Sequence, residues 1–291
     1  MLRISSLSKS YGSGPHAKVI FRDLDCAVDR GEVVCLVGPS GVGKSTLMRC
    51  IAGLATPVSG TVELNGAVIT KPHRDVALVF QDYSRSLMPW LRVVGNVTLP
   101  LRNRIKSRDE RRAEALSAIE AVGLRGSEDK YPWQLSGGMQ QRVAIARAIA
   151  CKPRLLLMDE PFASVDAQTR ADLEDLTLRL RDQFGMSVLV VTHDIDESVY
   201  MSDRVVVLRG SPARVVETLK IPLPTPRDQI NTKSEPVFAE LRAHILRRIR
   251  GELGDLQLPA ETAPAEPAGL AERMATPPST QPLASLARRH G

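Results

Sequence analysis

Residues 38–46, which read Gly-Pro-Ser-Gly-Val-Gly-Lys-Ser-Thr, constrain the fold of this chain more than any other stretch. They follow the apolar run 33–37 and precede the apolar run 47–52, so the expected context is a buried strand, a turn and a helix. The glycines allow successive N–H groups to point into one concavity, to which the helix adds its positive N-terminal end. A glycine-rich turn that binds nothing is disfavoured, because all fixed positions of the motif occur in this context. The stretch therefore predicts a phosphate-binding loop formed by Gly38, Pro39, Ser40, Gly41, Val42, Gly43, Lys44, Ser45 and Thr46.

Two side chains of this loop have specific predicted roles. Lys44 is expected to reach the β- and γ-phosphates of a nucleotide as a point charge. The hydroxyl of Ser45 is expected to bind the Mg²⁺ that bridges those phosphates.

Three further predicted strands end in polar side chains: one at Gln81, one at Asp159 and Glu160, and one at His193. Open α/β sheets bind ligands at the carboxyl ends of their strands. We therefore expect Asp159 in the Mg²⁺ shell and Glu160 to polarise the attacking water. Gln81 is a candidate for the Mg²⁺ or water shell, and His193 could contact the γ-phosphate. The alternatives are acidic caps on a strand and a structural histidine.

Bulk composition limits what a phosphate site could serve. The chain has 291 residues and a net charge of +6, a modest basicity that suits a nucleotide or an anionic membrane surface. Its four cysteines show no metal-ligand spacing and are interpreted as small buried residues of a reducing compartment. The N-terminus lacks a long apolar run, and about 18 uninterrupted apolar residues occur nowhere. We expect neither a signal peptide nor a membrane-spanning segment.

A cluster of basic residues lies at the start of a helix predicted over 105–124, whose apolar face carries Leu116, Ile119 and Val122. A solvated surface is the default interpretation of such a cluster, and a membrane-proximal or RNA-contacting surface is the alternative. The cluster comprises Arg102, Arg104, Lys106, Arg108, Arg111 and Arg112.

The second diagnostic stretch is residues 135–142, Leu-Ser-Gly-Gly-Met-Gln-Gln-Arg, which runs into an alanine-rich helix. Ser136 can cap this helix, and the two glycines leave its N-terminus bare, which makes a second anion-binding end. An ordinary capped helix would explain the stretch alone, although its companion motifs disfavour that interpretation.

Together these motifs resemble the ATP-binding subunit of an ABC transporter over about residues 1–225. In chain order they are Walker A at 38–46, the Q-loop Gln81, the signature at 135–142, Walker B with Glu160, the D-loop at 163–166 and the switch His193. The resemblance implies an α/β P-loop NTPase (RecA-like) core with an antiparallel β subdomain and a helical signature subdomain. It also implies ATP and Mg²⁺ as cofactors and ATP hydrolysis as the reaction.

Several residue roles come only from this resemblance. Tyr11 becomes the aromatic platform for adenine, Glu160 the general base, and His193 its partner in sensing the γ-phosphate. The family pattern also implies a head-to-tail dimer in which the signature of one chain closes over ATP held by the other. The signature residues concerned are Ser136, Gly137, Gly138 and Gln140. Val165 departs from the family's usual leucine in the D-loop.

Residues 81–91 and 222–228 resemble the nitrate, sulfonate and taurine importer group within this superfamily. That resemblance implies an integral membrane permease and, indirectly, a periplasmic solute-binding protein as partners. It places the chain at the cytoplasmic face of the bacterial inner membrane, with no nucleic acid expected. The alternatives are a soluble ABC ATPase that acts on nucleic acid or the ribosome, and a nucleotide sensor without turnover. Soluble ABC ATPases of that kind usually carry a second ATPase domain or a long coiled coil between Walker A and the signature, and this sequence shows neither.

The chain is predicted to divide into an ATPase domain at 1–225, a C-terminal helical region at 226–257 and a disordered tail at 258–291. The helical subdomain is expected at about 83–150. An amphipathic helix is predicted at 235–250, with apolar residues every fourth position. Its outward-facing residues are expected to be Arg242, Arg247, Arg248 and Arg250. The tail is rich in proline and alanine and poor in large apolar residues.

Overall fold

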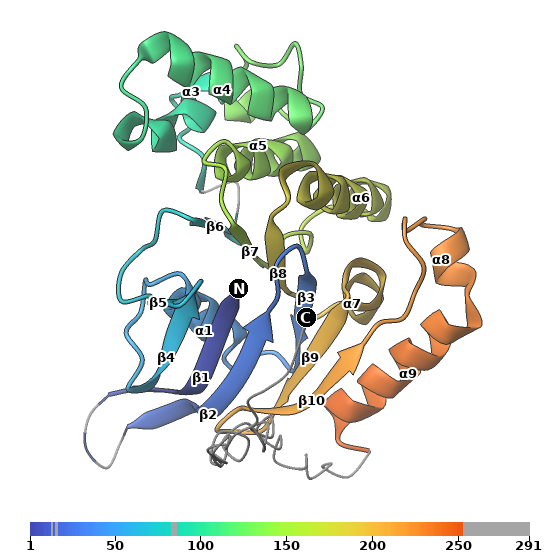
Figure 1. Cartoon of the computed structure of the whole chain (residues 1–291). Coiled ribbons are helices and arrows are strands. Elements are labelled where there is room, and N and C mark those ends of the chain that lie inside the picture. Colours follow the sequence, from blue (N-terminus) through green and yellow to red (C-terminus); the bar gives the residue numbers. More distant parts are fainter. Residues whose placement is uncertain (13, 15–16, 83–85, 253–291) are drawn as a thin grey trace, which may run out of the picture. The chain divides into compact units, whose positions relative to one another are not determined.

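The computed structural model describes residues 1–12, 14, 17–82 and 86–252. The predicted tail at 258–291 lies outside these residues. Within them, the chain forms two sheets, and helices pack on these sheets and on one another (Figure 1).

The first sheet is antiparallel, with the strand order β2-β1-β4-β5. Its strands are β1 (Leu2–Tyr11), β2 (Lys18–Val28), β4 (Ser59–Leu64) and β5 (Ala67–Val68). β1 pairs with β2 through register shifts that bend the hairpin.

The second sheet has the order β10-β9-β3-β8-β7-β6 and is parallel except for β10. Its central strands carry continuous Val and Leu runs because both faces of the sheet are covered. The strands are β3 (Val33–Val37), β6 (Val76–Val79), β7 (Leu155–Asp159), β8 (Ser187–Val191), β9 (Arg204–Arg209) and β10 (Arg214–Lys220). This parallel sheet confirms the predicted α/β core.

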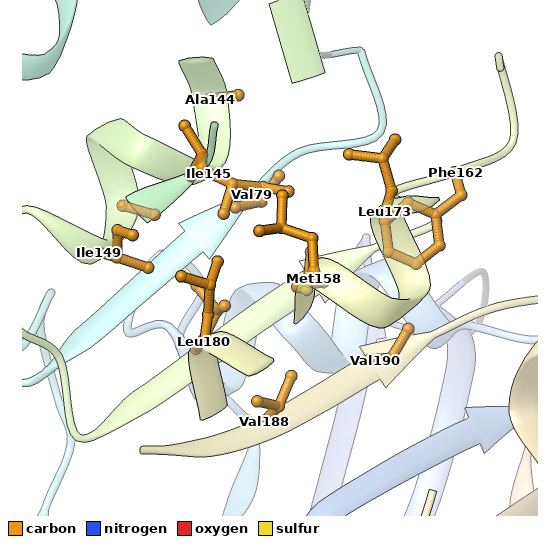
Figure 2. Close-up of a cluster of buried hydrophobic side chains, with 14 of the residues drawn as sticks. Val79, Ala144, Ile145, Ile149, Met158, Phe162, Leu173, Leu180, Val188 and Val190 are labelled. Atoms are coloured by element: carbon orange, nitrogen blue, oxygen red, sulfur yellow. The ribbon is translucent and has the colours of Figure 1, made fainter. Parts of the chain in front are cut away.

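Helices cover both faces of the parallel sheet. α1 (Lys44–Ile51) contacts β7 and β8, and α5 (Gly137–Ile149) contacts β6 and α6 (Ala167–Phe184). Figure 2 shows the buried side chains between α5, α6 and strands β6 to β8, including Ile145, Met158 and Val190. Burial of this apolar surface is the main stabilising term for the core.

A smaller group of helices packs on α5, on the side away from the sheet (Figure 1). Ser107 caps α4 by accepting a hydrogen bond from the backbone N–H of Glu110, so the helix predicted over 105–124 begins at Arg108. Ile119 and Val122 are buried as expected, and the exposed basic residues at its start fit a solvated surface. The group comprises α3 (Val93–Thr98), η2 (Leu99–Asn103), α4 (Arg108–Ala121) and η3 (Pro132–Gln134).

The remaining helices follow β8 and β10. They are α7 (Ile195–Met201), α8 (Asn231–Ser234) and α9 (Pro236–Arg250), and α9 packs against α7 and β9. None of the helices in the described part of the chain is both long and apolar enough to cross a lipid bilayer.

The orientation predicted for the C-terminal helix is wrong at Arg248. Arg248 is only 3% exposed, and its Nε atom donates a hydrogen bond to the carboxylate of Glu217 on β10. His244 contacts the same carboxylate at 3.0 Å. A periodicity that counts only apolar residues assigns Arg248 to the solvent side, because the acid that pairs with it lies on a distant strand.

Candidate functional site

The loop at 38–46 links β3 to α1, as predicted, and two of its glycines have structural reasons to be there. A Cβ atom on Gly38 would lie 2.4 Å from the backbone oxygen of Leu208, so the backbone passes too close to β9 for any side chain. Gly43 caps α1 with a φ of 112°, which is strained for other residues. The loop therefore presents main chain and the positive end of α1 at the carboxyl end of β3.

Lys44 is held across this loop. Its ammonium donates hydrogen bonds to the backbone oxygens of Gly38 at 2.8 Å and Pro39 at 3.1 Å. Burial lowers the pKa of Lys44, whereas the nearby carboxylates of Glu160 and Asp159 raise it. An ammonium has three donors, so one remains for a phosphate oxygen.

The side chain of Ser45 lies beside the first of the two acids that end β7. Its hydroxyl donates a hydrogen bond to Oδ1 of Asp159 over 3.2 Å. Burial raises the pKa of the Asp159 carboxyl, and the hydrogen bond from Ser45 opposes that shift. A hydroxyl and a carboxylate are oxygen ligands of the kind that Mg²⁺ prefers. The described residues contain no cluster of three or more His, Cys, Asp or Glu side chains suited to a metal.

The second acid, Glu160, has two polar neighbours. The amide Nε2 of Gln81 donates a hydrogen bond to Oε2 of Glu160 over 3.0 Å, and Nδ1 of His193 lies 3.3 Å from the same oxygen. These three residues follow β6, β7 and β8, which are neighbours in the sheet. Glu160 also has a positive φ of 45°, which costs about 1–3 kcal/mol and is typical of functional sites. The side chains expected at the carboxyl ends of separate strands thus meet at one point.

The signature residues form a separate group. Ser136 caps α5 by accepting a hydrogen bond from the backbone N–H of Met139, and the amide of Gln140 donates to the backbone oxygens of Pro132 and Leu135. Gly138 lies so close to α6 that a Cβ atom would be 2.4 Å from Cγ2 of Thr169.

Within the described residues, no hydrogen bond or ion pair joins the signature to the phosphate loop. The signature residues concerned are Ser136, Gly137, Gly138 and Gln140. The two anion-binding ends belong to different helices of the chain, α1 and α5.

Tyr11 is the last residue of β1 and pairs with Lys18 across the hairpin. It is 44% exposed, and the ammonium of Lys9 lies 5.0 Å from its ring centroid. An exposed ring of this kind can stack on a flat ligand.

The sequence did not identify the residues that support His193. Asp194 caps α7, and its carboxylate also accepts a hydrogen bond from Arg170 on α6 at 2.8 Å. Asp166 caps α6 in the same way, and hydrogen bonds from Thr169 lower the pKa of its carboxyl. The capping acids were visible in the sequence, but Arg170, the partner of Asp194, lies on another element.

This arrangement of a phosphate loop, two acids and a histidine on a parallel sheet defines a P-loop ATPase. Residues 21–163 match the ABC transporter family. The nitrate import ATP-binding protein NrtD of Synechocystis is 40% identical over 86% of this chain and 95% of its own length. The bicarbonate transport ATP-binding protein CmpD of the same organism is 39% identical over 84% of this chain and 87% of its own.

A solved structure shares the fold. It is the dimeric, post-hydrolysis state of an ATP-binding cassette bound to ADP and Pi, with 32% identity and a TM-score of 0.68, and the match covers 76% of this chain and 99% of that one. The chain belongs to the ABC transporter family, as an ATP-binding protein of an importer. It is an ATPase that supplies the energy for transport.

Proposed function

We propose that this protein drives the import of a small oxyanion, such as nitrate or bicarbonate, through a membrane permease. The relatives named above support this solute class, as does the likeness of residues 81–91 to nitrate and sulfonate importers. The protein would act at the cytoplasmic face of the bacterial inner membrane, with a periplasmic protein that delivers the solute. No observation favours a role on nucleic acid.

The observation that carries the proposed chemistry is the contact of Gln81 and His193 with one oxygen of Glu160. A carboxylate oriented by two neighbours can accept a proton from an attacking water. Glu160 would therefore be the general base, and Gln81 and His193 would couple its position to the γ-phosphate of ATP. Lys44 would neutralise the charge on the phosphates.

Mg²⁺ would be held by Ser45 and Asp159, with Gln81 as a further ligand. The ion would neutralise charge on the transferred phosphoryl group. The hydrogen bond between Ser45 and Asp159 supports this assignment, since both oxygens already face one another.

Two copies of the chain would form each complete site. The loop at 38–46 and Tyr11 of one copy would hold ATP, and the signature of the other would close over its phosphates. The separation of the two groups within one chain supports this arrangement, and so does the dimer of the related cassette. The proposal includes the domain limits predicted from the sequence. These are the ATPase domain at 1–225, its helical subdomain at about 83–150 and a separate region at 226–257.

The transport role is testable in a strain that lacks the gene for this chain. We expect loss of labelled nitrate or bicarbonate uptake, restored by the wild-type gene and not by Lys44→Ala. The matched control is Lys130→Ala, an exposed lysine of the loop before η3. Uptake of both anions that is unaffected by the deletion would contradict the proposed solute class.

A further inference from the structure

A small cavity lies beside Glu160 and His193, between α6 and the loop 192–194. Its volume is about 40 Å³. Two atoms of its lining residues are buried without a hydrogen-bond partner: Nε of Arg170 and Oε1 of Glu197. A cavity of this size can hold an ordered water, which needs two to four polar partners. The lining residues are Glu160, Ala163, Arg170, Thr192, His193, Asp194 and Glu197.

The walls of this cavity are tied to the loop that carries His193. The guanidinium of Arg170 donates to Oδ2 of Asp194 at 2.8 Å. The backbone N–H of Asp194 donates to the hydroxyl of Thr192 at 3.0 Å, and the backbone N–H of Glu197 donates to Oδ1 of Asp194 at 3.1 Å. Asp194 is therefore held on three sides, next to the residue that contacts Glu160.

Glu197 has no cation partner among the described residues. It is 4% exposed, and the one guanidinium that lines the cavity already pairs with Asp194. Burial raises the pKa of the Glu197 carboxyl well above its ordinary value, and the nearby acids Glu174 and Asp194 raise it further. The side chain of Thr192 and the charge of Arg170 oppose this shift without cancelling it. An isolated buried carboxylate is costly, whereas a carboxyl group that keeps its proton avoids that cost and can donate an O–H.

We propose that an ordered water in this cavity bridges Nε of Arg170 and Oε1 of Glu197, and that both side chains are positioning residues for His193. The inference rests on the proposed roles of Glu160 and His193. The water accepts a hydrogen bond from Nε of Arg170 and forms a second hydrogen bond with Oε1 of Glu197. Both buried atoms then have a hydrogen-bond partner. Loss of this bridge frees the loop 192–194, and His193 then spends less time in contact with Glu160. A misplacement of about 1 Å can lower a rate by about 100-fold.

Two structural measurements test the water and the proton. A crystal structure of the full chain should contain a water within hydrogen-bonding distance of both Arg170 Nε and Glu197 Oε1, and a dry cavity would overturn the proposal. The infrared spectrum of the full chain should show a carboxylic-acid carbonyl band that Glu197→Gln removes. Persistence of the whole band in that variant would overturn the assignment of a neutral Glu197.

Steady-state ATPase measurements on the full chain test the positioning role. Glu197→Gln keeps a neutral group that can bond the water, so its kcat should stay within about twofold of wild type. Glu197→Leu should lower kcat about tenfold or more with little change in KM for ATP. A Glu197→Leu variant with normal kcat, or a Glu197→Gln variant as slow as Glu197→Leu, would overturn the role. If Glu197→Leu does not fold, Thr192→Val is used in its place and judged by the same split between kcat and KM.

The matched control is Arg242→Met. It removes the ion pair that Arg242 forms with Asp196 at 2.7 Å, on the exposed side of the same helix α7. This variant should have the kcat of the wild type. An equal loss of kcat in Arg242→Met and Glu197→Leu would show that the effect comes from the stability of α7, and it would overturn the positioning role. A wild-type chain that does not hydrolyse ATP would contradict the proposed function, whereas the crystallographic and infrared results would still decide the water and the proton.

Discussion

Nδ1 of His193 lies 3.3 Å from Oε2 of Glu160, and this contact joins the ends of two neighbouring strands of the parallel sheet. The backbone reinforces it, because the N–H of Glu160 donates to the backbone oxygen of Val191 at 2.8 Å. The contact and the hydrogen bond thus tie the acid and the histidine to the ends of β7 and β8.

Replacement of Glu160 by glutamine tests the proposed base. Glu160→Gln keeps the shape of the side chain and its neighbours but cannot accept a proton, so ATP hydrolysis should fall by about 100-fold or more while ATP remains bound. The variant should accumulate as an ATP-loaded dimer on size-exclusion chromatography with Mg²⁺ and ATP. The control is Glu120→Gln, an exposed acid of α4 that pairs with Arg125. Turnover near the wild-type rate would show that another group activates the water.

Two substitutions of Tyr11 test adenine stacking. Tyr11→Phe keeps a flat ring and should be nearly silent, whereas Tyr11→Ala should weaken nucleotide binding by the ~1–3 kcal/mol of a base stack, at least about fivefold in Kd. A fluorescence titration with a nucleotide analogue gives both values. Equal affinities for the two variants would reduce Tyr11 to a packing residue of the β1–β2 hairpin.

The close contact of Gly138 with Thr169 predicts that Gly138→Ala lowers the stability of the fold, whereas the same change in an ordinary helix raises it. In an ordinary exposed helix, Gly→Ala stabilises by up to ~1 kcal/mol. Here the new methyl would meet Cγ2 of Thr169, so Gly138→Ala should destabilise by about 1–3 kcal/mol.

The matched rescue is Thr169→Ser, which removes Cγ2 and keeps the hydroxyl that donates to Asp166 at 2.7 Å. The double variant Gly138→Ala/Thr169→Ser should recover most of the lost melting temperature. If the single variant melts at or above the wild-type temperature, α5 and α6 are not as close as this structure has them.

The buried ion pair of the C-terminal helix predicts a large effect from one arginine and none from its neighbour. Arg248→Met removes a partner from the carboxylate of Glu217, which is only 13% exposed and keeps His244 beside it, and this should cost about 3 kcal/mol of unfolding free energy. Arg247→Met alters an exposed residue and should change stability by no more than ~0.5 kcal/mol. Urea denaturation measures both, and similar stabilities would place Arg248 at the surface, as the apolar periodicity alone predicts.

The sequence predicted the parts of the site that depend on local pattern. Asp159 ends an apolar run, and Lys44 lies in the loop that follows another. Parallel strands bring their carboxyl ends together at one edge of a sheet, so the contacts of Glu160 with Gln81 and His193 were expected from the strands that these residues follow. β3 coincides with the apolar run 33–37, and α5 begins directly after its predicted cap Ser136, because apolar runs and capping residues mark such boundaries.

Contacts between distant elements were beyond that reasoning. Arg170 lies 24 residues from Asp194, and Arg248 lies 31 residues from Glu217, so no local pattern links either pair. The amide of Gln140, expected at the nucleotide, donates to two backbone oxygens of the turn before α5, which only the fold of that turn reveals. Ion pairs between two elements depend on where the fold places the two side chains, and the periodicity of one element does not predict them.

We propose that each ATP site is shared by two copies of the chain, with Lys44 from one copy and Ser136 from the other. Lys44→Ala alone should inactivate both sites of a dimer through the phosphate loop, and Ser136→Arg alone should inactivate both through the signature. In a mixed dimer, one site combines the intact loop of the Ser136→Arg chain with the intact signature of the Lys44→Ala chain.

The decisive measurement is therefore the trapping and hydrolysis of ATP by a mixture of these two inactive variants, with crosslinking to prove that mixed dimers form. The shared-site account predicts that the mixture regains ATP trapping at the one intact site and part of the ATPase activity. Crosslinked mixed dimers that neither trap nor hydrolyse ATP would contradict it.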